Sequence, residues 1–208
     1  MERERNLLGL ASPRGVRRLM IPLLAACAAL SAAGSATAAV DTFHRFEAIA
    51  TANYTITERC ADGSTVQTRV TVIGGHEEES ESGVTTLDGD FLTVMIRGLD
   101  CEGNFINDRG SGPAEFTFSP SLQEASVIGT VTTRDGRSVS VNMSWEGTGG
   151  LEATSNTTTF SGFTGHFENR RRDAVASGTV VVDGETLIEG STTNAEIETL
   201  EDTNISQT

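Results

Sequence analysis

Four Asp-Gly pairs divide this chain into stretches in which apolar and polar residues alternate: Asp62-Gly63, Asp88-Gly89, Asp135-Gly136 and Asp183-Gly184. An Asp-Gly pair between two such stretches is the strongest short-range signal for a β-hairpin, because glycine accepts the left-handed backbone of a tight turn. The pairs therefore predict an all-β, antiparallel fold that is built from hairpins.

The positions of apolar residues predict the register of the first hairpin. Tyr54 lies on an even-numbered apolar face before the turn, and Val70 and Val72 lie on even numbers after it. Residues that face each other across an antiparallel pair share one side of the sheet. A three-residue loop, Ala61-Asp62-Gly63, keeps the apolar residues together and pairs Tyr54 with Val70.

The third hairpin supports the same construction. A loop of Arg134-Asp135-Gly136 pairs Val131 with Val139 and Val127 with Met143, all on odd-numbered positions. Trp145 continues this face, so we expect its indole in an apolar environment.

The other two turns are less defined. Asp88-Gly89 admits the same loop with Val84 opposite Leu92, whereas Asp183-Gly184 follows three consecutive valines and leaves its register open. Further strands are predicted over 115–118, 164–169 and 174–182. The total of roughly ten strands, without a convincing long helix, predicts a β-barrel or a β-sandwich.

Three stretches rich in polar or turn-forming residues are expected to be irregular, at 74–82, 100–113 and 147–159. Loops of this kind are where binding residues often lie. The C-terminal segment 191–208 is polar and acidic, and we expect it to form at most one more strand before it becomes disordered.

The N-terminal residues 1–38 are typical of a secretory signal peptide: an arginine-rich start, an apolar run over 19–33, and small residues before a cleavage site after Ala38. This leaves a single all-β domain over 39–190, followed by the tail. In the alternative, Leu24-Ala25-Ala26-Cys27 has the form of a bacterial lipobox and would leave a lipid anchor on Cys27. No later stretch has the length of about 20 apolar residues that a membrane-spanning helix needs.

Composition excludes one class of partner. The chain has a formal net charge of −14, and its 15 basic residues are all arginine. A protein this acidic repels nucleic acid. Arginine without lysine suggests a GC-rich, bacterial genome.

The cysteines agree with export. Removal of Cys27 with the signal peptide leaves Cys60 and Cys101, an even pair without the C-x-x-C spacing of a redox or metal site. We therefore expect a structural disulfide between them.

Catalytic and metal-binding patterns are weak. The chain has three histidines, His44, His76 and His166, and carries no nucleophile elbow, zinc motif or phosphate loop. His166 could act as a base, but a histidine on the polar face of a strand is far commoner, and we expect that role here. The acidic residues 77–79 and 88–90 lack the spacing of a calcium loop and are expected to be a solvated surface. We predict no catalytic, cofactor or metal site.

Two features suggest binding. Arg170, Arg171 and Arg172 form the one basic cluster, which could contact an anion or a partner, or could pair with carboxylates of its own surface. The small residues Ala48, Ala50 and Ala52 share an inward face that Trp145 is also expected to border. They either let a second layer approach closely or leave room for an interior ligand.

The sequence thus predicts an exported, noncatalytic β protein that binds a small apolar ligand or a protein partner. The alternatives are a secreted hydrolase with an unrecognised site and a purely structural surface protein.

Overall fold

The computed structural model describes residues 40–207, and every regular element within them is a β-strand. None of these residues forms a helix that is long and apolar enough to cross a membrane. The expected signal peptide and Cys27 lie outside the described residues. The strands are β1 (Val40–Arg59), β2 (Thr65–Glu81), β3 (Val84–Leu99), β4 (Phe105–Pro113), β5 (Glu115–Phe118), β6 (Glu124–Thr132), β7 (Ser138–Gly147), β8 (Glu152–Phe160), β9 (Phe163–Val182) and β10 (Glu185–Gln207).

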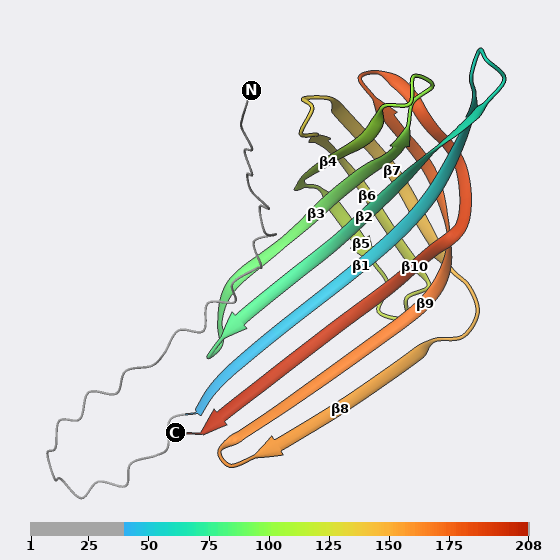
Figure 1. The fold of residues 1–208 in the computed structure, drawn as a ribbon. Coiled ribbons are helices and arrows are strands. Elements are labelled where there is room, and N and C mark those ends of the chain that lie inside the picture. The colour runs from blue at the N-terminus through green and yellow to red at the C-terminus, as the bar shows by residue number, and fades with distance from the viewer. Residues whose placement is uncertain (1–39, 208) are drawn as a thin grey trace, which may run out of the picture. The chain divides into compact units, whose positions relative to one another are not determined.

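The strands form one antiparallel sheet in the order β4-β3-β2-β1-β10-β9-β7-β6-β5, with β8 paired to β9 (Figure 1). The predicted all-β class and the number of strands are confirmed. The sheet is not closed into a barrel. Long strands such as β1, β9 and β10 run through its whole length, whereas β4 to β7 occupy only one end of it.

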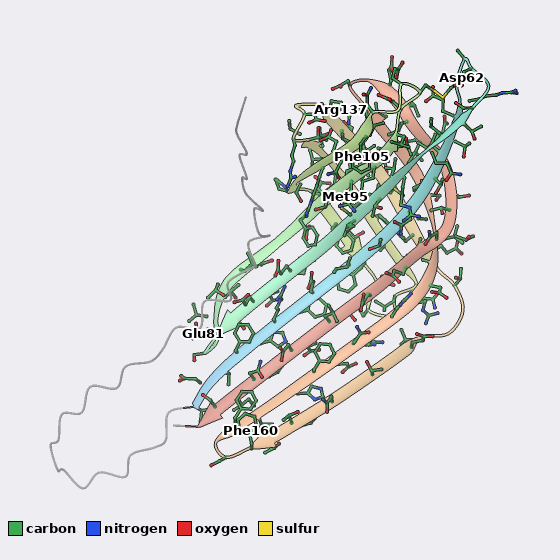
Figure 2. The ribbon with its side chains drawn as sticks, in the orientation of Figure 1. Asp62, Glu81, Met95, Phe105, Arg137 and Phe160 are labelled. Atoms are coloured by element: carbon green, nitrogen blue, oxygen red, sulfur yellow. A yellow bond between two sulfur atoms is a disulfide. The ribbon has the colours of Figure 1, made fainter. Side chains whose placement is uncertain are left out.

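The sheet therefore has two parts. In the covered half, β5, β6 and β7 lie over the inner face of β1, β2 and β3, so close that a Cβ on Gly74 would lie 2.7 Å from the Cβ of Val127. Beyond β5 to β7 the sheet continues as a part that we call the extension. Figure 2 labels Glu81 and Phe160 in the extension, and Asp62 and Arg137 in the covered half. The extension consists of 40–47, 77–81, 84–90, 152–160, 163–169 and 200–207.

The core fills the covered half. Ala48, Ala50 and Ala52 have no exposed surface, and Trp145 is 2% exposed, as its position predicted. The indole Nε1 of Trp145 donates a hydrogen bond to the carbonyl oxygen of Thr51 at 3.0 Å, which joins β7 to β1 across the core. Small side chains on β1 let the two layers approach to this distance.

Two predicted turns are present as expected. Gly63 and Gly136 have φ of +87° and +81°. Each ends a three-residue loop, and the amide of each glycine donates to the carbonyl oxygen three residues earlier. Tyr54 pairs with Val70, and Val127 pairs with Met143.

The prediction for the second turn is wrong. Val84 pairs with Glu81, and the turn lies at Ser82-Gly83, where both residues have positive φ. Asp88 and Gly89 lie within β3 in the extension. The fourth pair, Asp183-Gly184, forms a two-residue turn that is closed by Val182 and Glu185.

Most of the expected irregular stretches are strands. Residues 74–81 complete β2, residues 105–113 form β4, and residues 152–159 lie in β8. The expected polar tail is strand up to Gln207 and lies between β1 and β9 in the middle of the sheet. The parts of these segments at 77–81, 152–159 and 200–207 lie in the extension, where strands form without a buried face, so their sequences lack the alternation that burial imposes.

Candidate functional site

A pocket with five aliphatic side chains in its wall opens at the end of the covered half that carries the Asp62 turn. It has a volume of about 560 Å³. We call it the end pocket. Its apolar side chains come from five strands, and Thr68 of β2 adds a polar one. The apolar residues are Ile56, Ile96, Ile106, Val182 and Leu187.

The path of β10 explains why space remains there. β10 pairs with β1 only from Ala195 onward, and its register against β9 shifts between Thr192 and Ala195. The β9–β10 hairpin therefore leaves β1 before its turn, and Ile56 has a strand partner on β2 alone. Ile56, Val182 and Leu187 remain only partly buried.

One ion pair stiffens the rim of this pocket. The Nη2 and Nε atoms of Arg137 donate to Oδ2 of Asp108 at 2.7 and 3.0 Å, and Asp108 is buried. Burial alone raises the pKa of Asp108, but hydrogen bonds from Thr133, Arg137 and the amide of Asp135 outweigh it, so the pKa lies below its usual value. The other rim residues, Glu58, Asp183 and Glu185, are exposed.

The alanine face expected to border an interior ligand lies in the packed core. Because Ala48, Ala50 and Ala52 have no accessible surface, no space large enough for a water molecule adjoins them. The structure brings these residues and Trp145 together in the core, and the accessible apolar space lies further along the same strand at Ile56.

The three consecutive arginines do not face one ligand together, because successive side chains on a strand point to opposite faces. Arg170 lies 4.0 Å from Glu168 on the inner face. Arg171, on the outer face, contacts Glu196 at 2.6 Å. Arg172 donates to the carbonyl oxygen of Gly149 at 3.0 Å.

A second feature lies on the inner face of the extension, where the covering layer ends. The rings of Phe46 and Phe118 stack with centroids 5.9 Å apart, beside a cleft of about 290 Å³ that Glu168, Arg170 and Glu201 also line. The cross-strand row through Phe46 carries a carboxylate on each of four neighbouring strands. These carboxylates belong to Asp88, Glu78, Glu201 and Glu168, and we call this set the Phe46 row.

The three histidines share this inner face, since His44 and His166 both pair with Thr203 and His76 pairs with Ala48. Nδ1 of His76 lies 2.8 Å from Asp90, and Nε2 of His44 lies 3.3 Å from Glu201. Nδ1 of His166 lies 3.0 Å from Oγ1 of Thr157. Within residues 40–207, no three His, Cys, Asp or Glu side chains converge as metal ligands.

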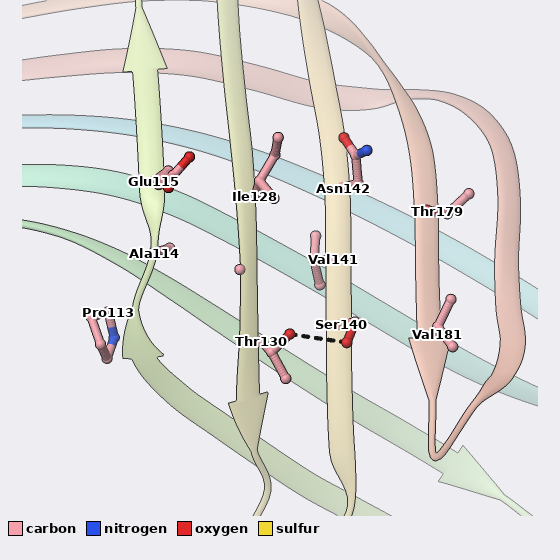
Figure 3. Close-up of a pocket in the computed structure, with 11 residues that line it drawn as sticks. Pro113, Ala114, Glu115, Ile128, Thr130, Ser140, Val141, Asn142, Thr179 and Val181 are labelled. Carbon is pink, nitrogen blue, oxygen red and sulfur yellow. Dashed lines mark hydrogen bonds between the residues drawn. The ribbon is translucent and has the colours of Figure 1, made fainter.

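A third hollow is an open trough on the outward side of β6, β7 and β9 (Figure 3). Thr130 and Ser140 bond to each other across it at 3.0 Å. Ile128, also on its wall, is 51% exposed. Because Thr130 and Ser140 already bond to each other and the trough has no enclosing wall, it is a weaker candidate than the end pocket.

The sequence did not indicate the end pocket. Ile56 alone carried a usable signal, because it continues the even-numbered apolar face of β1. Ile106 fell in a segment that was expected to be a loop. Leu187 and Val182 come to lie opposite these residues only because β1 pairs with β10, which is not its neighbour in the sequence. The even or odd numbering of apolar residues within a hairpin does not predict such a pairing.

The comparisons add no relative: no protein-family model, curated protein or solved structure matches this chain.

Proposed function

We propose that the protein is an exported, noncatalytic binding protein that takes a small apolar ligand in the end pocket. The observation that carries this proposal is the pocket itself, whose volume of about 560 Å³ lies within the range of small-molecule sites and whose wall combines five aliphatic side chains with a polar and charged rim. The covered half would serve as a sandwich that is open at this end. The Cys60–Cys101 disulfide is compatible with an extracellular location.

Charge around the pocket narrows the ligand class. Arg137 is occupied by Asp108, and the other rim charges are carboxylates. An anionic ligand such as a fatty acid would meet three carboxylates there and is disfavoured. The ligand that fits is neutral or weakly cationic, with an apolar body.

Nile red, a neutral apolar dye with environment-sensitive fluorescence, tests the proposal. We expect saturable binding with blue-shifted emission. Thr68→Phe, which fills the pocket, and Leu187→Gln, which makes its wall polar, should each weaken binding by about tenfold.

Ile128→Gln is the matched control, because it also replaces a partly exposed aliphatic residue but lies on the outward trough. Emission from Trp145 reports whether each variant is folded. Binding that does not saturate, or that weakens equally in Leu187→Gln and Ile128→Gln, would rule out the end pocket as the site.

A second candidate function is the docking of a basic protein segment on the inner face of the extension. It is favoured by the Phe46 row, in which Glu78 lies opposite Asp88 and Glu201 lies opposite Glu168. Like charges directly opposite each other destabilise a sheet. A guanidinium group above Phe46 would relieve this repulsion and stack on the ring.

A hexa-arginine peptide tests this second candidate by calorimetry. The double substitution of Glu168 and Glu201 by Gln should lower its affinity more than the same change at Glu124 and Glu146. That control pair also lies face to face across two strands, but it is exposed on the covered half. Equal losses from both pairs would mean that the peptide responds only to net charge.

The alternative of a secreted hydrolase requires a nucleophile that is held by a base. Among the described residues, the histidine with a hydroxyl partner is His166, which contacts Thr157. Thr157→Ala should leave Nile red binding unchanged, so any hydrolytic activity that it abolished would separate the two functions.

A further inference from the structure

β8 forms an open margin of the extension (Figure 1). It pairs with β9 along its whole length, from Glu152 opposite Arg171 to Phe160 opposite Phe163. Among residues 40–207, no strand pairs with its other edge. All nine of its side chains are exposed.

The hairpin geometry identifies the backbone groups on this free edge. A two-residue turn is closed by Phe160 and Phe163, so these two residues exchange hydrogen bonds with each other. Hydrogen-bonded pairs alternate along an antiparallel ladder. The amide and carbonyl groups that point away from β9 are therefore those of Ala153, Ser155, Thr157 and Thr159.

This edge lacks the features that protect edge strands. Soluble proteins protect such edges with charged residues, proline or bulges. The free edge of β3 in the extension follows this rule, because Asp88 and Asp90 flank Gly89 there. β8 has no proline and no bulge, and its single charge, Glu152, lies at its first position.

We infer that β8 pairs antiparallel with β8 of a second copy of this chain, with the two-fold axis at Asn156. This register places Ser155 opposite Thr157 of the second copy and Glu152 opposite Phe160. The outward backbone groups then face each other, hydroxyl side chains lie across from one another, and no like charges meet. The two extensions become one continuous sheet.

Light scattering coupled to size-exclusion chromatography tests the inference on the full chain, across a dilution series. Ser155→Pro removes one outward amide and leaves the hydrogen bonds to β9 intact, since proline is tolerated on edge strands. We expect the parent and Ser155→Ala to reach twice the monomer mass, and Ser155→Pro to remain monomeric. A monomeric parent, or a dimer that persists in Ser155→Pro, overturns the inference.

A cysteine variant tests the register even if the proline variant folds poorly. At the two-fold axis the Cα atoms of Asn156 would lie about 4.5 Å apart, a spacing that a disulfide can bridge. Asn156→Cys should form a covalent dimer under mild oxidation. Leu87→Cys places a cysteine on the free edge of β3, and under the same oxidation it should form no more covalent dimer than the parent chain does. Equal cross-linking at both positions overturns pairing through β8.

Discussion

Gly63 and Gly136 occupy turn positions whose backbone conformation favours glycine. Each has positive φ, and nothing lies within 4 Å of the position that a Cβ would take. Backbone strain therefore disfavours other residues at these positions, although there is space for a side chain. At Asp108, by contrast, the side chain and its contacts matter. Its buried carboxylate accepts hydrogen bonds from Arg137 and from backbone amides.

Gly136→Ala should lower the free energy of unfolding by about 1 kcal/mol, because alanine is strained at positive φ. Gly150→Ala is the matched control, since Gly150 also has open space around it but no positive φ. Urea denaturation measures the free energy of unfolding of both variants. Equal effects of the two substitutions would contradict the assignment of strain to Gly136.

Asp108→Asn should destabilise the protein by about 2–3 kcal/mol at neutral pH, because the substitution leaves Arg137 without its carboxylate. The pKa of Asp108 is lowered in the folded state, so its contribution is present above the usual value of 3.8 and is lost as the pH falls through the folded pKa. Urea denaturation at several pH values should show the difference from the parent shrinking below about pH 4. A difference that is constant down to pH 2 would contradict this.

At the level of elements, contact between the two layers depends on the small side chains of β1. Ala50 lies in the core with no exposed surface, and the close approach of the layers lets Trp145 bond to Thr51. The alanines therefore act in packing, which was one of the two alternatives that the sequence left open.

Ala50→Leu should overpack this contact and lower stability by about 2 kcal/mol. Because Trp145 is the single tryptophan, its native emission should also move to longer wavelength as the layers separate. Thr55→Leu adds a similar side chain at an exposed position of the same strand and should change neither quantity. Unchanged emission in Ala50→Leu would show that the layers are not in close contact at β1.

The sequence predicted elements well where they are buried and poorly where they are not. Alternation of apolar residues marks a strand with one buried face, and this is why the pairings of Tyr54 with Val70 and of Val127 with Met143 were predictable. β8 has no buried side chain, so its threonines and asparagine resembled a loop. The carboxylates of β2 resembled a solvated turn for the same reason.

At the level of the whole molecule, one sheet serves two purposes. Its covered half holds the core and ends in the end pocket, and the extension presents faces and an edge to solvent. The Cys60–Cys101 disulfide, with Cα atoms 5.4 Å apart, joins the β1–β2 turn to the β3–β4 loop at the pocket end. In the chain-entropy model, closing this loop contributes about 4 kcal/mol to stability.

The end pocket could not be predicted from the sequence, because it depends on how distant strands are arranged in the whole molecule. The even or odd numbering of apolar residues predicts which face of the sheet they share. It does not show where β10 leaves β1 and opens the space beside Ile56. That separation depends on the register shift between Thr192 and Ala195, within a segment whose polar composition predicted a tail.

Isoleucine δ1-methyl NMR during a Nile red titration tests the central claim most directly, because the isoleucines are spread over the molecule. The account predicts that shifts are confined to the methyl groups of Ile56, Ile96 and Ile106 at the end pocket. Ile128 on the outward trough and Ile205 on the extension serve as internal controls and should not move. Shifts at Ile128 or Ile205 without shifts at the three pocket residues would contradict the account.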